Sequence, residues 1–322
     1  MTTRRTFVLG LAALGAARHA FAQSAPAPRI GWISYTPPGV ALDAFQEGMR
    51  SLEYAGKNAA LVEVRVVEPN AERVRATLDE LRKLPVALII CQAAIGPVAH
   101  KVNAGRVPLV IAFSGDPVVA GMVESFGRPG GTTTGMSFMA LELVGKRLEV
   151  LREIAPSVRR VAIVANPQHP GEKAELKASL DAAERLGIAT SYVQILPGEG
   201  REAAFDRIVQ ERVQGIVVFP DAEMVARAAR IAEFALKERL MAISGWSQFA
   251  QAGFLATYGP NLNDAYRRLA YYADRLLRGA RAADLPVELP SRLELVVNMK
   301  TAGALGITIP QAILLRADEV IQ

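Results

Sequence analysis

The sequence is poor in the residues that carry metal, redox and disulfide chemistry. Its 322 residues include one cysteine, Cys91, and three histidines. A single cysteine excludes an internal disulfide and a thiolate metal cluster. No HExxH, CxxC or P-loop motif occurs, and the glycine-rich stretch 127–135 lacks the GxGxxG spacing of a dinucleotide site. These absences argue against the commoner metal and nucleotide chemistries, and we expect the protein to work without a cofactor.

The first 22 residues have the pattern of an export signal. Two arginines, Arg4 and Arg5, precede an apolar run over 7–17, and Ala20-Phe21-Ala22 supplies the small-x-small motif of a cleavage site. The apolar run is shorter than the ~20 residues that a membrane-spanning helix needs. We therefore predict a signal peptide at 1–22, export by the twin-arginine route and a periplasmic location.

After the predicted signal peptide, the chain has only a small excess of basic residues. The formal net charge is +5, and it falls to +2 when the arginines of the predicted signal peptide are left out, because that segment contains no acidic residue. No block of Lys and Arg and no basic stripe with interleaved aromatic residues remains. The composition therefore offers no argument for nucleic-acid binding.

Long apolar runs are few, but one of them organises the chain. Residues 107–113 are apolar and largely β-branched, which is typical of a strand buried on both faces of a parallel sheet. Similar patterns recur at offsets of 129 to 132 residues: 29–35 with 160–166, 85–91 with 214–220, and 107–113 with 239–245. The repetition predicts an α/β protein of two Rossmann-like lobes, each with a parallel sheet.

The order of predicted elements supports three crossings between the lobes, which describes a three-strand hinge. We assign 29–137 plus 260–284 to lobe I and 138–259 plus 285–322 to lobe II. Helices are predicted at 42–54, 71–83, near 118, 141–154, 172–186, 203–211, 222–239 and 261–278. Strands outside the repeated patterns are predicted at 61–67, 133–138, 190–196, 254–258 and 293–298. A hinge of this kind permits closure on a ligand.

Ligands bind at the carboxyl edge of parallel sheets, so the residues at the strand ends are the candidates for a site. The predicted ligand-binding residues are Ser34, Tyr35, Gln92, Ala93, Ser114, Asp116, Asn166, Asp221, Trp246 and Tyr258. No residue is predicted to be catalytic or to bind a metal.

Asp116 and Trp246 occupy matching positions after the two copies of the organising strand. Asp116 has two compatible interpretations, an N-cap for a helix that starts near Val118 and a carboxylate that receives an ammonium group. A helix N-terminus beside that carboxylate would favour an anion, so the pair would suit a zwitterion. For Trp246, core packing and binding surface both stay open.

Many short motifs in a fixed order resemble the substrate-binding protein family of ABC transporters, which has the type I periplasmic binding fold. The resemblance spans nearly everything after Pro28. The motifs are Phe113–Val118, Arg128–Gly131, Lys146–Glu149, Ala165–Pro167, Tyr258–Pro260 with Asp264–Arg267, Ala283–Val287, Leu293–Ala302, Leu305–Pro310 and Arg316–Ile321. The resemblance implies a monomer that captures a small solute in the interlobe cleft and delivers it to an inner-membrane permease, without covalent chemistry.

The resemblance leaves the ligand open. Some relatives bind aromatic amino acids, which would suit Asp116 for the ammonium group and Trp246 or Tyr35 for a ring. After Asn166, however, this chain carries Gln168-His169-Pro170-Gly171 where those relatives carry small polar residues. Two other functions are carried as alternatives: a sensory binding protein for a receptor, and a periplasmic α/β enzyme. The enzyme would use Asp116, Asp221 and His169 as acid and base, but no nucleophile–base pair and no GxSxG motif is recognisable.

Overall fold

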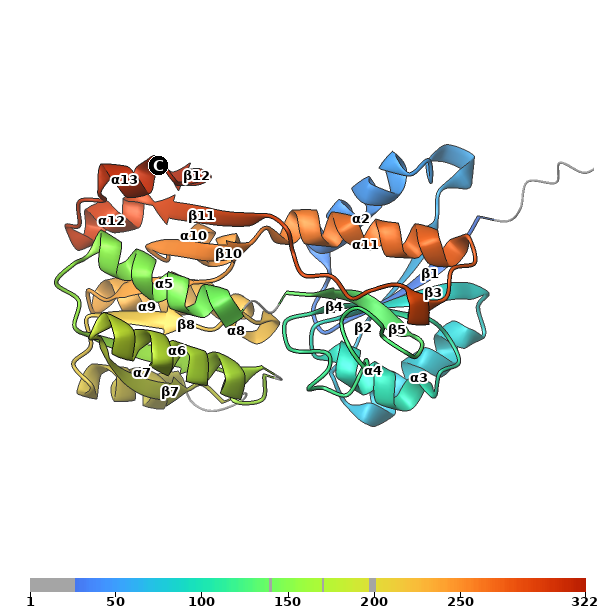
Figure 1. Ribbon diagram of the computed structural model, residues 1–322, viewed down its shortest axis with the longest axis horizontal. Helices are drawn as coiled ribbons and strands as arrows, with labels where there is room; N and C mark the ends of the chain where they lie inside the picture. Colours follow the sequence, from blue (N-terminus) through green and yellow to red (C-terminus); the bar gives the residue numbers. More distant parts are fainter. Residues whose placement is uncertain (1–26, 139–140, 170, 197–200) are drawn as a thin grey trace, which may run out of the picture.

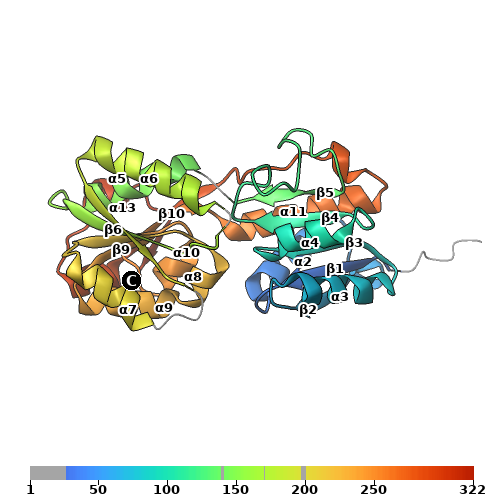
Figure 2. The ribbon, with the colours of Figure 1, turned by 90° about the horizontal axis from the view of Figure 1, so that it is seen from below.

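The computed structural model describes residues 27–138, 141–169, 171–196 and 201–322, which form two α/β lobes side by side (Figures 1 and 2). The first lobe contains a five-stranded parallel sheet in the order β2-β1-β3-β4-β5. Its strands are β1 (Arg29–Ser34), β2 (Leu61–Val66), β3 (Val86–Gln92), β4 (Leu109–Phe113) and β5 (Thr133–Ser137). Its helices are α2 (Gly39–Ser51), α3 (Ala71–Arg82), α4 (Ile95–Asn103) and α11 (Leu262–Leu277), with short 3-10 turns at Gly56–Asn58 and Ala282–Asp284.

The second lobe contains a seven-stranded sheet in the order β12-β11-β10-β9-β8-β6-β7. Its strands are β6 (Arg160–Ala165), β7 (Ala189–Gln194), β8 (Gly215–Val218), β9 (Met241–Ser244), β10 (Ala256–Pro260), β11 (Leu293–Asn298) and β12 (Glu319–Ile321). Its helices are α5 (Leu141–Ile154), α6 (Glu172–Leu186), α7 (Arg201–Gln210), α8 (Ala222–Ala226), α9 (Ala228–Lys237), α10 (Ser247–Gln251), α12 (Met299–Leu305) and α13 (Gln311–Leu314).

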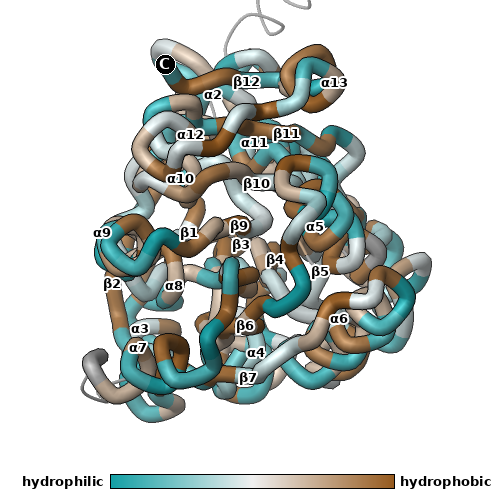
Figure 3. The backbone as a smooth tube through the Cα atoms, turned by 90° about the vertical axis from the view of Figure 1, so that its left-hand side faces the viewer, coloured by the Kyte–Doolittle hydropathy of each residue, from teal (hydrophilic) through white to brown (hydrophobic). Residues whose placement is uncertain are grey.

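The predicted fold class is confirmed, and the apolar strands are central in both sheets. In β3 and β4, every side chain from Leu88 to Cys91 and from Leu109 to Phe113 is at most 1% exposed. Helices cover both faces of a parallel sheet, which is why these strands are continuously apolar. One pairing departs from the predicted parallel arrangement, because β11 runs antiparallel to β10. Figure 3 shows hydrophilic stretches mostly on the outer helices such as α6, α7 and α9.

Two helix predictions were wrong. The predicted helix near Val118 is a single turn: Oδ1 of Asp116 accepts the amides of Val118 and Val119, but Gly121 then adopts a φ of +69° and the amide of Met122 bonds back to the carbonyl of Pro117. Asp116 therefore caps a turn that never becomes a helix.

The predicted helix at 222–239 is interrupted at Arg227, between α8 and α9. Arg227 has φ −103° and ψ −3°, in the bridge region, and its amide bonds to the carbonyl of Met224 in a tighter turn. Apolar residues keep their helical spacing across the break, so periodicity alone could not reveal it. The strand β12 and the helix α10 were not predicted.

The chain passes between the two sheets three times, after β5, between β10 and α11, and between the turn at Ala282–Asp284 and β11 (Figure 1). The second passage brings α11 back to the first lobe, where it lies along α2. The approach is close because Gly48 has no side chain: a Cβ there would lie 2.5 Å from the carbonyl oxygen of Arg267 and 2.8 Å from Cβ of Ala270. Tyr54 adds a hydrogen bond of 3.0 Å to Asp274.

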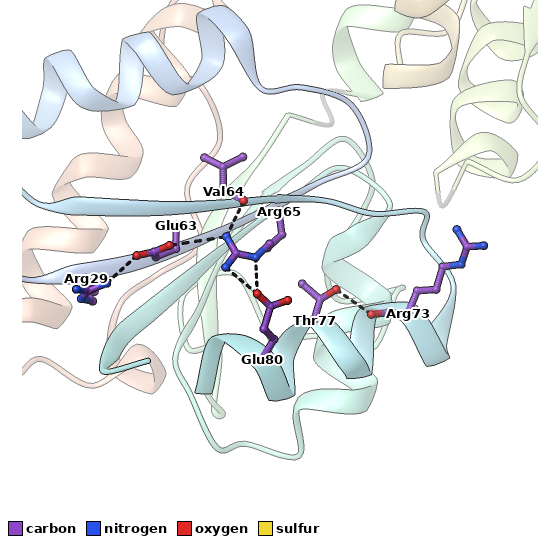
Figure 4. Close-up of polar contacts among 7 residues, drawn as sticks. All are labelled: Arg29, Glu63, Val64, Arg65, Arg73, Thr77 and Glu80. Carbon is purple, nitrogen blue, oxygen red and sulfur yellow. Dashed lines mark hydrogen bonds and ion pairs between the residues drawn. The ribbon is translucent and has the colours of Figure 1, made fainter. Parts of the chain in front are cut away.

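Charged side chains cover β2, one of the two edge strands of the first sheet (Figure 4). Arg29 of β1 donates to Glu63 at 2.8 Å, and Arg65 makes two hydrogen bonds of 2.9 and 2.8 Å to Glu80 of α3. Each exposed ion pair contributes only about 0–1 kcal/mol. Their main effect is to keep the edge polar, which discourages pairing with another strand.

Substituting Gly48→Ala should lower the free energy of unfolding by about 1–3 kcal/mol, because the new methyl group meets backbone of α11 and forces the helices apart. The matched control is Gly303→Ala in α12, where no heavy atom lies within 4 Å of the new Cβ. That variant should be unchanged or up to about 1 kcal/mol more stable. Urea denaturation measures both, and equal stability of the Gly48 variant and the parent would refute the close helix contact.

Candidate ligand-binding cleft

Two adjoining cavities lie between the lobes, and both are lined by residues at the ends of strands. The larger has a volume of about 540 Å³, and the smaller, which we call the hinge-side cavity, about 180 Å³. They share Ala93, Ser114 and Ala222, so they form one cleft. The name hinge-side refers to Phe138 and Leu262, which flank two of the crossing segments and line the smaller cavity.

A strained turn carries the chain from β3 into the cleft wall. Ala93, which lines both cavities, has a φ of +53°, and its amide is held by the carbonyl of Ala112 at 2.8 Å. A left-handed alanine costs free energy and persists only where its surroundings impose it. Gln92, before this turn, lines the hinge-side cavity, and Ala94, after it at the start of α4, lines the larger cavity.

The two lobes touch directly through Ser114 and His169. Oγ of Ser114 and Nε2 of His169 are 2.8 Å apart, and the residues are 6% and 8% exposed. Gly171 also approaches the first lobe: a Cβ there would lie at ordinary van der Waals distance, 3.5 Å, from Cα of Gly115. Burial lowers the pKa of His169 to about 4, so its imidazole is neutral at physiological pH.

A serine hydroxyl bonded to a histidine is also the geometry of a nucleophile and its base. In this pair, however, Nδ1 of His169 has no hydrogen-bond partner in the described part of the chain, so no third group orients the ring. A pKa of about 4 also makes the imidazole a weak base. The geometry favours a contact that holds the lobes together.

Asp221 is a buried carboxylate in the wall of the larger cavity. It is 6% exposed, accepts the amide of Met224 at 2.7 Å as the N-cap of α8, and accepts Nδ2 of Asn166 at 3.0 Å. Burial raises the pKa of Asp221 to about 6, which the two hydrogen bonds partly oppose. The carboxylate is thus ionised at neutral pH although none of its described partners is a cation.

Among the described residues, no lysine or arginine lines either cavity. The charged residues in the lining are Glu68, Asp221 and Glu223. Glu68 forms an ion pair with Arg73, and Glu223 with Arg227. Among the described residues, Asp221 is therefore the carboxylate of the lining that has no ion-pair partner.

A buried arginine lies behind the cleft wall. Arg147 of α5 is 3% exposed, and its Nε donates to the carbonyl of Tyr258 at 3.1 Å. A Cβ on Gly245 would lie 2.5 Å from Nη2 of Arg147, so the glycine beside Trp246 makes room for the guanidinium. Burial raises the pKa of Glu175 to about 7, while the charge of Arg147 acts in the opposite direction. This arginine supports the backbone of the wall and does not line the cavities.

Seven of the ten predicted residues line the cleft. Tyr35, Asn166 and Asp221 line the larger cavity, Gln92 and Trp246 line the hinge-side cavity, and Ala93 and Ser114 line both.

The other three predicted residues lie outside the two linings. Ser34 is fully buried, and Asp116 caps the turn that follows Pro117. The ring of Tyr258 packs against an apolar cluster of the second lobe. Their strands were predicted, but the strand end alone does not determine which of its residues faces the cleft.

Several lining residues were not predicted as ligand-binding. His169 belongs to the stretch that departs from the amino-acid-binding relatives, and this departure was the signal that could have marked it. Gln248 lies on α10, which was not predicted. Tyr266 reaches the hinge-side cavity from α11, more than 120 residues after the last strand of its own lobe, and no local pattern marks that contact.

The fold and the cleft define a two-lobed binding protein, and comparison with known proteins identifies its family. Residues 39–321 match the ABC transporter substrate binding protein family, and the chain belongs to it. The tyrosine-binding protein of Clostridioides difficile (strain R20291) is 24% identical over 207 residues. That match covers 62% of this chain and 57% of the relative, which is less than two thirds of the relative's length.

Solved structures confirm the type I periplasmic binding fold. A Streptococcus pneumonia structure in complex with L-Trp has a TM-score of 0.82 at 20% identity and covers 92% of this chain and 100% of that one. The ligand-free, open structure of a Clostridium difficile substrate-binding protein with adhesive properties has a TM-score of 0.69 at 19% identity and covers 92% and 99%. In the described part of this chain, no helix has the length and apolarity to span a membrane.

The pH dependence of stability should show the neutral, buried state of His169. The unfolded chain binds a proton near pH 6.5 and the folded one only near pH 4, so protonation favours unfolding as the pH falls through this window. Relative to His169→Gln, the parent protein should lose on the order of 3 kcal/mol of unfolding free energy between pH 7 and pH 4. Asp221 and Glu175 shift stability in the opposite sense, but both proteins contain them. Parallel stability curves from urea denaturation would contradict the assignment.

Proposed function

We propose that the protein is the periplasmic solute-binding component of an ABC importer, which captures a small organic solute carrying a protonated amine and delivers it to an inner-membrane permease. The observation that carries the proposal is Asp221, a buried carboxylate without a cationic partner in the wall of an interlobe cavity. Membership of the substrate-binding protein family supports the transport role. The predicted signal peptide, which would place the protein in the periplasm, lies outside the described residues.

The proposed ligand of Asp221 follows from its unbalanced charge. The Met224 amide occupies one carboxylate oxygen and Asn166 the other, but each oxygen keeps a lone pair for a further hydrogen bond. A buried anion is costly without an opposite charge, and a charge-assisted bond to an ammonium group would compensate it. We therefore assign the ammonium to Asp221; Asp116, the first candidate for that role, lies outside the cavity lining.

The same cavity offers a place for an anion. No side chain caps α4, and Ala94 at its start lines the larger cavity. The amide of Gly96 is bonded to the carbonyl of Ala93 at 3.0 Å and Pro97 has no amide hydrogen, so the helix dipole and the amides of Ala94 and Ile95 are what would favour an anion. A carboxylate there and an ammonium at Asp221 would suit a zwitterion. An amino acid or a related amine is thus the proposed solute class, and the tyrosine-binding relative and the L-Trp complex support it.

The test compares two carboxylates that both follow a strand. Asp221→Asn should weaken the binding of amino acids and amines about 10-fold or more, since a hydrogen bond to a charged group contributes about 1.5–3 kcal/mol. Asp116→Asn is the control and should bind like the parent protein. Thermal shift across a panel of amino acids and amines would find the solute, and calorimetry would give the affinities. Unchanged affinity in the Asp221 variant would refute the ammonium site.

A further inference from the structure

Three residues that line the hinge-side cavity carry buried polar atoms without a partner among the described residues. Oε1 of Gln92, Nε1 of Trp246 and Oε1 of Gln248 are buried, and none of them has a hydrogen bond in the described part of the chain. Trp246 as a whole is only 6% exposed. Buried polar atoms in native proteins are nearly always hydrogen-bonded, so three such atoms in the wall of one cavity indicate a missing polar partner.

Most of the rest of this wall is apolar, and Thr36 and Ser114 are its other polar residues. Phe138 and Tyr266 pack edge to face, with ring centroids 5.4 Å apart, and the ring of Trp32 lies 6.3 Å behind Tyr266. The hydroxyl of Tyr266 in turn holds the amide of Gln92 at 2.8 Å. The polar atoms are therefore set in place before a ligand arrives, which reduces the entropy lost on binding.

The pair of Gln92 and Tyr266 defines the kind of group that fits. In the structure, Nε2 of Gln92 donates to the Tyr266 hydroxyl, which leaves Oε1 as an acceptor and the phenol hydrogen as a donor. If the amide were turned over, the phenol would donate to Oε1 and leave Nε2 as the donor and the phenol oxygen as the acceptor. Either orientation presents at least one donor and at least one acceptor.

Charge excludes the other common polar groups. In the part of the chain that the structure describes, no lysine or arginine lines the hinge-side cavity, so a carboxylate or phosphate would be desolvated there without a counter-charge. An ammonium group would leave the indole N–H of Trp246 without an acceptor. Among common side-chain groups, the hydroxyl and the primary carboxamide both donate and accept and stay uncharged throughout the physiological pH range.

We infer that the hinge-side cavity recognises a neutral hydroxyl or primary carboxamide at the far end of an apolar arm, while the amine of the solute stays at Asp221. The inference rests on the proposed function and narrows its solute class. Gln92, Tyr266 and Trp246 form hydrogen bonds to this polar group. Gln248 of α10 offers a further acceptor. An arm of hydrocarbon alone would leave the buried atoms unpaired and bind more weakly.

Matched pairs of solutes test this directly. Each pair shares its amine and differs only at the end of the arm: tyrosine and phenylalanine, tyramine and phenethylamine, glutamine and norvaline. Calorimetry on the purified protein should show the polar member binding at least 10-fold more tightly in the pair that binds best. Gln92→Leu should bring the ratio of the two affinities close to 1, chiefly because the polar member of the pair binds more weakly. Trp246→Phe should also lower this ratio, although it keeps an aromatic side chain at position 246.

Gln168→Leu is the control variant, because Gln168 lines only the larger cavity, and it should keep the ratio of the parent protein. Circular dichroism establishes that each variant is folded. Equal or tighter binding of the hydrocarbon member, or a ratio that Gln92→Leu and Trp246→Phe leave unchanged, would overturn the inference while the amine site stands. Failure of every pair to bind would overturn the proposed function, and this inference with it.

Discussion

The contact between α2 and α11 is the constraint on which the cleft depends. These helices are distant in sequence, and they lie close because Gly48 leaves room for the backbone of α11 at Arg267. The contact returns the chain to the first lobe after β10, which fixes where the hinge crosses. It also places Tyr266 of α11 against Gln92 of β3, so this packing determines where these two polar side chains lie in the wall of the hinge-side cavity.

The electrostatics of the cleft depend on two arginines that lie outside its lining. Arg147 is buried behind the wall, where it supports the carbonyl of Tyr258, and Arg227 neutralises Glu223. Neither described hydrogen-bond partner of Asp221 is a cation, and burial raises its pKa to about 6. An arginine in the lining would favour anions, whereas a buried carboxylate favours a positively charged group, which is the basis of the proposed amine ligand.

The hydrogen bond between the lobes joins two neutral side chains. Ser114 and His169 meet across the cleft at 2.8 Å, and burial keeps the imidazole uncharged at neutral pH. A neutral hydrogen bond between lobes is modest in free energy, about 0.5–1.5 kcal/mol, so it can close the cleft without preventing its opening. A solute that bridges Asp221 in the second lobe and Gln92 in the first would add its own contacts to the closed form, which shifts the population toward closure.

The sequence by itself determined the two α/β lobes and most of the strand-end residues, because buried parallel strands are continuously apolar and their ends are abruptly polar. Residues such as Ser114, Asn166 and Asp221 were found in this way. Only the tertiary structure decided between Asp116 and Asp221: both carboxylates follow a strand, but one caps a surface turn and the other is enclosed in the cleft wall. It also brought Tyr266 and Gln248 to the cavity, since contacts between distant elements depend on how the helices pack and leave no local signal in the chain.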